Sequence, residues 1–423
     1  MSGIVIIGGG QAGASMAAKL RALDDDVEIT LVSAENDPPY QRPPLSKGYL
    51  LGDMTRDRLY LRPADFYQSQ RINLRLGAEV TAIDVAAKTV SIGDETLSYD
   101  QLALTTGSIA NRLPASIGGD LKGVFTVRTL ADVDAMADEF TEGARVLVIC
   151  GGYIWLEAAA VESKLGLKVT LVEMARRILG RVAAVETADV IREKHQSEGV
   201  DIREGVGVST LTGEDGRVTA AELTDGTTLD VDFVIVGVGI RPATGLAEAA
   251  GLTCNDGIFL DAFGRTSDRN IWAAGDCANF PYGEERLRLE SVQNAIDQAE
   301  IVAENILGAH KEYRPYPWFW SDQYDLKLQI AGLNTGYDLV VRRGDGAPCS
   351  HWYFKGETLL AVDAISAPRD YMVGKRLIEA GKSPDPAILA DPNSDLKEIF
   401  TDGGLVAEAG EAWDWRPLAT AMQ

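Results

Sequence analysis

Histidine, cysteine and long apolar runs are scarce in this chain of 423 residues. It has three histidines and four cysteines, and no Cys-x-x-Cys pair occurs. We therefore expect neither a metal site nor a disulfide framework. No run of about 18 apolar residues is present, so no membrane-spanning segment is expected. The first residues enter a strand with no charged leader before it, which predicts a cytoplasmic protein.

Basic residues are also few relative to acidic ones. Lys and Arg total 40 against 63 Asp and Glu, which gives a formal net charge of −23. Such a surface repels nucleic acid and anionic lipid, so neither is an expected partner. The apolar share of 46% is enough for a large core, and the length predicts two or three domains.

What is present begins with a glycine motif. Gly8, Gly10 and Gly13 follow the apolar run Ile4 to Ile7 at the spacing Gly-x-Gly-x-x-Gly. A strand, a glycine turn and a helix in this order let the backbone lie against a pyrophosphate. After a second predicted strand comes Glu35, whose carboxylate can hold a ribose hydroxyl. This order predicts a dinucleotide-binding domain; the alternative is an ordinary glycine turn.

The same plan repeats about 140 residues later. A strand at 146–149 leads into a turn at 150–155, a helix at 156–165 and a strand at 169–172 that Glu173 follows. Two such folds suggest two dinucleotides, although a structural repeat with one working site is the alternative. A carboxylate at Glu173 would accept from a ribose 2′-hydroxyl and repel a 2′-phosphate, which favours NADH.

Two later regions complete the chain. Asp276 ends a predicted strand that starts at Ile271, where its carboxylate can accept hydrogen bonds from a ribityl or ribose chain. From about Pro315 aromatic residues and alternating strands predict an α+β domain. The stretch 401–423 is interpreted as a loosely held tail.

Three strings carry a family resemblance: residues 39–47 (PYQRPPLSK), 290–295 (ESVQNA) and 317–324 (PWFWSDQY). With the two glycine turns, they make the chain resemble the FAD-dependent NADH:ferredoxin reductases of bacterial cytochrome P450 and ring-hydroxylating dioxygenase systems. The resemblance covers roughly residues 3 to 400. It implies an α/β fold of the glutathione-reductase type, with two Rossmann-like dinucleotide-binding domains and an α+β C-terminal domain. The implied domains are 1–112 with 242–320 for FAD, 113–241 for NADH, and 321–400.

The resemblance also implies site residues. Positions matching the FAD pattern are Gly8, Gly10, Ala12, Gly13, Glu35, Arg42, Lys47, Val80, Arg128, Asp276, Val292 and Trp320. Those expected at NADH are Gly151, Gly152, Tyr153, Ile154, Glu173 and Gly239. Lys47 is expected beside the electron-accepting edge of the flavin, paired with Glu157, and these two are the predicted catalytic residues.

The second glycine motif departs from the family. The family has glycine where this chain has Cys150 and Trp155, although Gly152 is kept. Cys150 is expected to strain the turn, and Trp155 must displace the neighbouring strand or point into the cleft. Three hypotheses follow: NADH binds weakly in a shifted pose, a different or smaller hydride donor binds, or no nicotinamide binds.

The implied reaction carries electrons from NADH through FAD to a [2Fe–2S] ferredoxin. Disulfide reductases of the superfamily have a cysteine pair where this chain has Pro43 to Lys47, so the acceptor should be external. The alternatives are an NADH oxidase, a rubredoxin reductase, or a flavoprotein like apoptosis-inducing factor with weakened nicotinamide binding. The oligomeric state is expected to be monomer or homodimer. Candidate docking cations are Arg286, Arg288, Arg342, Arg343, Lys375 and Arg376.

Overall fold

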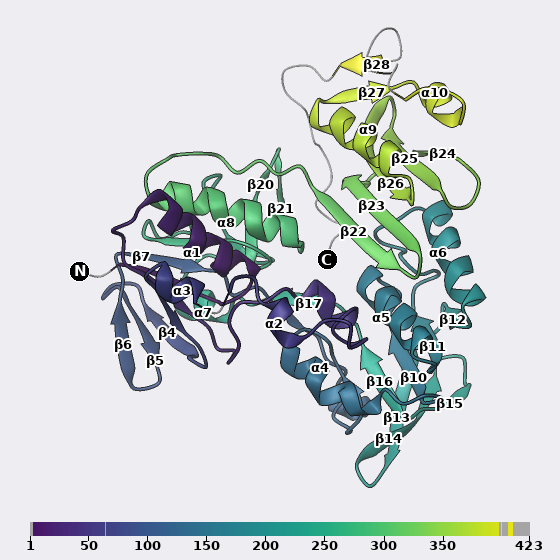
Figure 1. Ribbon diagram of the computed structural model, residues 1–423, viewed down its shortest axis with the longest axis horizontal. Coiled ribbons are helices and arrows are strands. Elements are labelled where there is room, and N and C mark those ends of the chain that lie inside the picture. Colours follow the sequence, from purple (N-terminus) through teal and green to yellow (C-terminus); the bar gives the residue numbers. More distant parts are fainter. Residues whose placement is uncertain (1–2, 64, 397–398, 400–404, 409–423) are drawn as a thin grey trace.

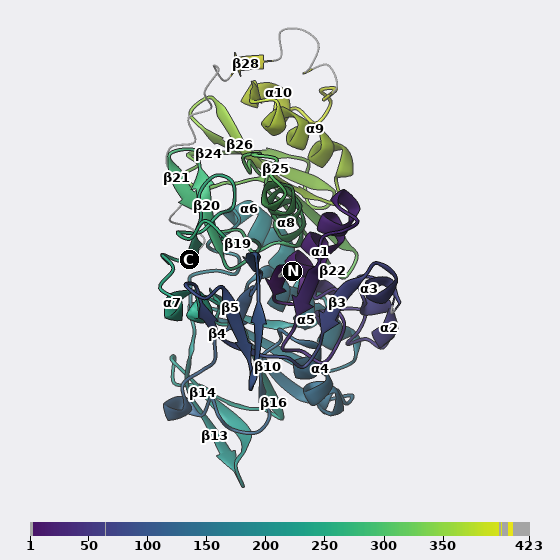
Figure 2. The same ribbon diagram turned by 90° about the vertical axis from the view of Figure 1, so that its left-hand side faces the viewer.

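The computed structural model describes residues 3–63, 65–396, 399 and 405–408 of the chain (Figure 1). Three parts, each built on one five-stranded sheet, lie side by side (Figures 1 and 2). Most of the predicted tail, 401–423, lies outside the described residues. Only Leu405–Glu408 of it is described, as strand β28, which pairs with β27 (Lys382–Pro384).

The first part has a parallel sheet in the order β19-β7-β1-β2-β3. Its central strands are almost wholly apolar because helices or other strands cover both faces. Helices α1 and α8 run next to each other on one face (Figure 1), where Met16 and Leu20 share a core with Val302. The elements are β1 (Ile4–Ile7), α1 (Gln11–Leu23), β2 (Ile29–Val32), η1 (Pro43–Ser46), α2 (Arg56–Leu59), α3 (Phe66–Ser69), β3 (Ile72–Arg75), β4 (Val80–Asp84), β5 (Thr89–Ile92), β6 (Glu95–Ser98), β7 (Gln101–Leu104), α7 (Gly245–Ala249), β18 (Ile258–Phe259), β19 (Ile271–Ala273), β20 (Ala278–Tyr282), β21 (Glu285–Leu287) and α8 (Val292–Ile306).

The second part repeats this plan with the sheet β12-β11-β10-β16-β9. Its helix begins at Tyr153, three residues earlier than the predicted start at 156. Strands β8 and β17 pair with each other at the two points where the chain passes between the first and second parts. The elements are β8 (Ser108–Ala110), η2 (Ala115–Ile117), β9 (Val124–Phe125), α4 (Leu130–Met136), η3 (Ala137–Glu139), β10 (Arg145–Ile149), α5 (Tyr153–Lys164), β11 (Lys168–Glu173), α6 (Val185–Ser197), β12 (Asp201–Glu204), β13 (Val208–Glu214), β14 (Arg217–Leu223), β15 (Thr228–Asp230), β16 (Phe233–Val236) and β17 (Ile240–Pro242).

The third part is an antiparallel sheet in the order β22-β23-β26-β25-β24, covered by α9. It starts at Trp318, slightly before the boundary predicted at residue 321. The elements are β22 (Trp318–Gln323), β23 (Leu326–Gly332), β24 (Leu339–Arg343), β25 (Cys349–Lys355), β26 (Thr358–Ile365), α9 (Pro368–Glu379) and α10 (Pro386–Ala390).

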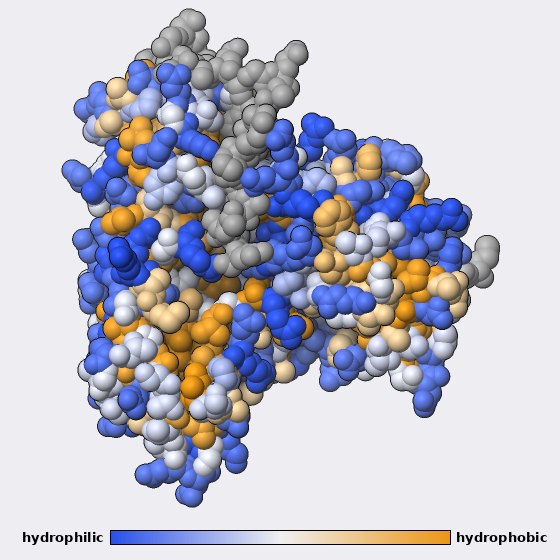
Figure 3. All heavy atoms as spheres, turned by 180° about the vertical axis from the view of Figure 1, so that it is seen from behind, coloured by the Kyte–Doolittle hydropathy of each residue, from blue (hydrophilic) through white to orange (hydrophobic). Residues whose placement is uncertain are grey.

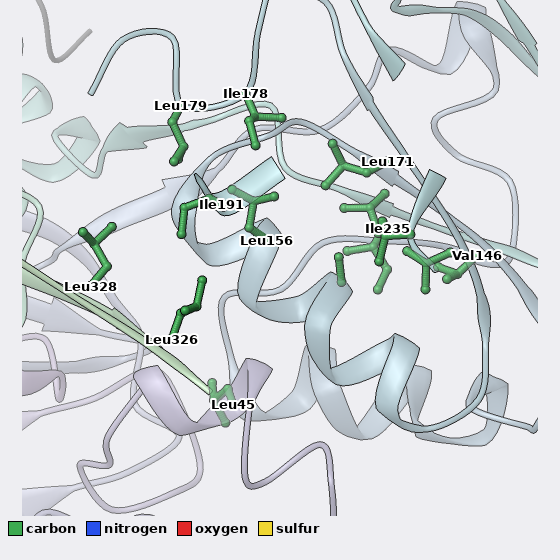
Figure 4. Close-up of a cluster of buried hydrophobic side chains, with 14 of the residues drawn as sticks. Leu45, Val146, Leu156, Leu171, Ile178, Leu179, Ile191, Ile235, Leu326 and Leu328 are labelled. Atoms are coloured by element: carbon green, nitrogen blue, oxygen red, sulfur yellow. The ribbon is translucent and has the colours of Figure 1, made fainter. Parts of the chain in front are cut away.

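The largest hydrophobic cluster joins the three parts. Leu45 from η1, Leu156 from α5 and Leu326 from β23 belong to it, and all three are at least 92% buried. In Figure 4 the helix that carries Leu156 is α5. Leu45 lies below this helix, and Leu326 and Leu328 lie to its left. Because apolar burial contributes roughly 25 cal/mol per Å², a shared cluster fixes how the parts sit against one another.

The outer surface is dominated by hydrophilic residues, with hydrophobic patches between them on the face seen from behind (Figure 3). In the described ranges, no helix combines the length and the apolarity that crossing a bilayer requires. All four cysteines are free thiols in the structure.

The carboxyl group of Glu162 on α5 is deeply buried. It has an exposed fraction of 0%, and neither of its oxygens has a hydrogen-bond partner among the described residues. Burial raises the pKa of Glu162 to about 8. The folded protein therefore holds a proton that the unfolded chain releases above a pH of about 4.5.

We expect Glu162→Gln to flatten the pH dependence of stability. Because the folded pKa lies above the unfolded one, the wild-type free energy of unfolding falls as the pH rises through this interval. The free energy of unfolding of the variant should rise relative to that of the wild type between about pH 5 and about pH 8, as measured by denaturant midpoints. Glu193→Gln, at an exposed position on α6, is the control. An equal pH slope in Glu162→Gln and wild type would contradict this account.

Candidate functional site

The first glycine turn has the geometry that its spacing predicts. Gly8 has φ +115°, and a Cβ on it would lie 2.2 Å from the Thr105 carbonyl oxygen. A Cβ on Gly13 would lie 2.0 Å from the Gly8 oxygen, whereas one on Gly10 would meet nothing within 4 Å. Two glycines thus permit the turn and the close helix, and the third leaves open space at the start of α1. The free amides of that first turn favour an anion there.

The acid after β2 is held in place by two neighbours. Arg42 Nη2 lies 2.6 Å from Glu35 Oε1, and the Tyr40 hydroxyl donates to Oε2 at 2.5 Å. Arg42 also donates to the Arg128 carbonyl oxygen at 2.6 Å. A carboxylate offers about four lone-pair positions, so Glu35 keeps acceptor capacity for a ribose.

The predicted ribityl-binding aspartate pairs with the predicted arginine. Arg128 Nη2 donates to Asp276 Oδ2 at 2.8 Å, and the Ser108 hydroxyl donates to the same oxygen at 2.8 Å. This links β8, the segment before α4 and the carboxyl end of β19 at the edge where open sheets bind ligands.

Three other residues expected near FAD lie in different settings. Val80 is buried in a core of the first part, and Val292 is the first residue of α8, where backbone amides lack helical partners. Trp320 is half-buried on β22 and its ring packs 5.5 Å from that of Trp318.

The second turn has the same backbone shape with a cysteine in it. Cys150 has φ +111°, close to the +115° of Gly8. A side chain in this region costs on the order of 1–3 kcal/mol, so the predicted strain is present. Glu173 folds back on the turn, with Oε2 accepting from the Gly151 amide at 2.8 Å and Oε1 from that of Ala175 at 2.7 Å.

Trp155 lies over the carboxyl end of β16. A Cβ on Gly237 would fall 1.9 Å from the indole Nε1 of Trp155. At the matching place in the first fold, Gly13 faces Thr105. The large and the small residue are therefore exchanged in the second fold. Trp155 stands on the helix where the first fold has Gly13, and Gly237 follows the strand where the first fold has Thr105.

The remaining residues expected at NADH surround this turn. Gly152 precedes α5, Ile154 is 50% exposed, and Gly239 has φ +89°. The Tyr153 ring instead packs 5.3 Å from Phe319 on β22, and its buried hydroxyl finds no hydrogen-bond partner in the residues that the structure describes.

The predicted catalytic pair forms an ion pair between two parts. Lys47 Nζ lies 2.9 Å from Glu157 Oε1, and the Glu157 side chain is only 6% exposed. The Ser321 hydroxyl donates to the same oxygen at 2.7 Å and the Asp322 amide at 3.2 Å. Burial raises the pKa of Glu157, and Lys47 and the two other donors oppose that rise.

Sequence reasoning missed several members of these clusters. Tyr40 and Ser321 belong to strings quoted for the resemblance, but neither was predicted as a site residue. Tyr40 meets Glu35 five positions away, whereas Ser321 meets Glu157 across 164 positions. Ser108 likewise meets Asp276 across 168 positions. The signal available was only that polar residues sit inside otherwise apolar or motif-bearing strings.

Three of the candidate docking cations make hydrogen bonds or ion pairs within the chain. Arg288 is 8% exposed and pairs with Glu290 and Asp256. Arg286 donates to Asn279 and to the Leu260 carbonyl oxygen. Arg343 donates hydrogen bonds to backbone carbonyl oxygens around α10, among them those of Leu389 and Pro392. Of the six candidates, Arg342 on β24 and Arg376 on α9 are exposed.

Comparison with known proteins gives the class. Residues 2–299 match the family described as pyridine nucleotide-disulphide oxidoreductase, and residues 318–400 match the one described as reductase C-terminal. The chain therefore belongs to the pyridine nucleotide-disulphide oxidoreductase family, as predicted. The described fold agrees with the predicted α/β class.

Relatives of similar length narrow this further. A ferredoxin–NAD(P)+ reductase of a Sphingomonas species is 43% identical over 405 residues, covering 94% of this chain and 97% of the relative. Putidaredoxin reductase of Pseudomonas putida is 39% identical, covering 94% and 96%. The solved covalent putidaredoxin reductase–putidaredoxin complex matches with a TM-score of 0.90 at 39% identity, covering 94% of this chain and 97% of that chain.

This membership implies FAD and NAD(P)H, which confirms the predicted cofactors. The residues of the first part fit FAD, because the turn at Gly8 is open at Gly10 and Glu35 and Asp276 present carboxylates at the sheet edge. The second turn keeps Gly151 and Gly152 but has Cys150 at its positive-φ position and Trp155 at the start of α5, where the indole packs against Gly237.

We expect Gly13→Ala to lower FAD content. The new Cβ would meet the Gly8 oxygen at 2.0 Å, which forces α1 away from the turn that its amides must line. Purified variant should carry less than about half of the FAD of wild type, measured by absorbance after denaturation. Gly245→Ala, whose Cβ would meet nothing within 4 Å, is the control. Full FAD occupancy in Gly13→Ala would contradict the close-packing role of this glycine.

We expect the double variant Cys150→Gly, Trp155→Gly to bind NADH more tightly. It removes the indole from the sheet edge and the strain from the turn. A gain of about 1 kcal/mol corresponds to a roughly fivefold lower dissociation constant and a lower KM. Calorimetric titration with NAD+ and steady-state kinetics with NADH measure the two constants. Trp318→Ala is the matched tryptophan control, and an unchanged affinity in the double variant shows that the indole stands clear of the nucleotide.

Proposed function

We propose that this chain is an FAD-dependent reductase that takes a hydride from NADH and passes electrons one at a time to a [2Fe–2S] ferredoxin. The acceptor in turn serves a cytochrome P450 or a ring-hydroxylating oxygenase. The observation that carries the proposal is the near full-length similarity to named ferredoxin reductases, together with the Lys47–Glu157 pair.

Lys47 supports this chemistry through its charge. Bound FAD supplies the change between two-electron and one-electron transfer. A fixed ammonium stabilises negative charge that develops during reduction, and the water-poor setting strengthens that effect. Glu157 orients the ammonium, since its carboxylate is itself fixed by Ser321 and the Asp322 amide. We assign Lys47 the electrostatic role and Glu157 the role of holding it.

The acceptor is external to the chain. The η1 segment at Pro43–Ser46, with Lys47 after it, stands where disulfide reductases of this superfamily have a cysteine pair, and all four cysteines of the chain lie elsewhere. No dithiol is therefore available beside the proposed flavin site to take the electrons.

The donor is NADH rather than NADPH. The Glu173 carboxylate lies against the Gly151 amide at the second turn, where it would repel a 2′-phosphate. Arg176, three residues after Glu173, is exposed, and Arg177 donates a hydrogen bond to the Ala183 carbonyl oxygen. We place the reaction in the cytoplasm because free thiols are typical of a reducing compartment.

A second candidate acceptor is rubredoxin. A rubredoxin–NAD+ reductase of Pseudomonas putida is 36% identical over 372 residues, covering 86% of this chain. The [2Fe–2S] ferredoxin is favoured because the two relatives reported above, both more similar, are named as ferredoxin reductases or as putidaredoxin reductase. The net charge of −23 opposes an acidic partner at long range, so docking requires a local cationic surface.

Anaerobic mixing with NADH tests the proposal. We expect the flavin absorbance near about 450 nm to bleach in wild type and to bleach at least tenfold more slowly in Lys47→Met. With a [2Fe–2S] ferredoxin as acceptor and cytochrome c as the final reporter, NADH should be oxidised faster than with oxygen alone or with rubredoxin. Oxygen as the fastest acceptor would indicate an NADH oxidase. Flavin that NADH scarcely reduces would indicate a flavoprotein of the apoptosis-inducing-factor type.

A further inference from the structure

A continuous series of hydrogen bonds runs from the catalytic pair into the protein. Ser321 Oγ lies 2.7 Å from Glu157 Oε1, Gln323 Nε2 lies 3.0 Å from Ser321 Oγ, and His195 Nε2 lies 2.8 Å from Gln323 Oε1. Lys47 stands at the other end, 2.9 Å from Glu157. The series crosses from η1 to α5, then to β22 and back to α6, so it joins all three parts.

The chemistry of the groups fixes the direction of every bond. An ionised carboxylate only accepts, so the Ser321 hydroxyl must donate to Glu157. The Ser321 oxygen then accepts from the Gln323 amide nitrogen, which turns the Gln323 oxygen toward His195 as an acceptor. His195 must therefore carry its proton on Nε2. Its Nδ1 then carries no proton, and this buried atom has no hydrogen-bond partner within the described part of the chain.

All of these side chains are inaccessible to water. His195 and Ser321 are 0% exposed and Gln323 is 1% exposed. Each donor points toward Glu157, so the bond dipoles add in the same sense and strengthen one another at low dielectric. Burial also lowers the pKa of His195 to about 4, which keeps the ring neutral.

We propose that Ser321, Gln323 and His195 are positioning residues that hold the Glu157 carboxylate in the orientation from which it fixes Lys47. Through that pair, they act on flavin reduction although none of them is required to touch the cofactor. The proposal rests on the function proposed above for Lys47 and Glu157.

The alternative is that these residues only join α6 to the third sheet. A second buried network on the same helix provides a matched control. Thr187 is 0% exposed, and its hydroxyl is hydrogen-bonded to His351 Nδ1 and to Asp363 Oδ2, each at 2.8 Å. These partners do not belong to the series that ends at Glu157. Thr187→Val thus disturbs the same α6 interface and leaves the Glu157 series intact.

The experiment compares Ser321→Ala and Gln323→Met with Thr187→Val in the FAD-loaded protein. Anaerobic stopped-flow mixing separates the limiting rate of flavin bleaching from the dissociation constant of NADH. Loss of a hydrogen bond to a charged group predicts a roughly tenfold lower limiting rate in Ser321→Ala, with the NADH constant within about twofold of wild type. Thr187→Val should lower the melting temperature and leave the rate within about twofold. Ser321→Thr, which keeps the hydroxyl, should restore the rate.

A second readout does not depend on NADH. The flavin midpoint potential, measured during photochemical reduction, should become more negative in Ser321→Ala, because the freed carboxylate draws the Lys47 charge to itself. It should be unchanged in Thr187→Val. Equal behaviour of Ser321→Ala and Thr187→Val in rate and in potential would overturn the positioning role. If NADH fails to reduce the wild type, the proposed function fails, and the potentials still decide this inference.

Discussion

Polar contacts that link the three parts converge on one buried carboxylate. The Glu157 carboxylate forms an ion pair with Lys47 of the first part. It also accepts hydrogen bonds from the Ser321 hydroxyl and the Asp322 amide of the third part. A buried ion pair repays its desolvation only with good geometry and further hydrogen bonds, and here the Ser321 hydroxyl and the Asp322 amide donate to the same Oε1 that pairs with Lys47. The surrounding cluster of Leu45, Leu156 and Leu326 excludes water and holds the donors at these distances.

Under the proposed function, redox chemistry gives the Lys47–Glu157 pair a role that stability alone does not. A hydrophobic pair of similar volume is often as stable as a buried ion pair, so the proposed role lies in the charge of Lys47. Lys47 also ends the η1 turn at a place where the superfamily carries cysteines. A fixed cation in place of a dithiol suits an enzyme whose electrons leave the protein.

The local pattern of the sequence predicts the elements well and the contacts between them poorly. Glycine spacing and apolar runs locate β1, α1, β10 and β11, because these signals come from neighbouring residues. The partners of Glu157 and Asp276 come from more than 100 positions away, so spacing carries no record of them. The direction of the Trp155 indole also depends on a distant residue, Gly237, whose missing side chain makes the room.

The two glycine turns differ in a way that suits their different ligands. The turn at Gly8 needs no strained residue, so a cofactor bound there loses nothing to the backbone and can stay through many turnovers. The second turn stores strain at Cys150, and its Gly151 amide is already taken by Glu173. We expect a nucleotide entering it to compete with the Glu173 carboxylate and to meet the Trp155 indole, so that its binding is weakened. Weak binding is compatible with a donor that must leave after each hydride, whereas the same features at the first turn would cost the enzyme its flavin.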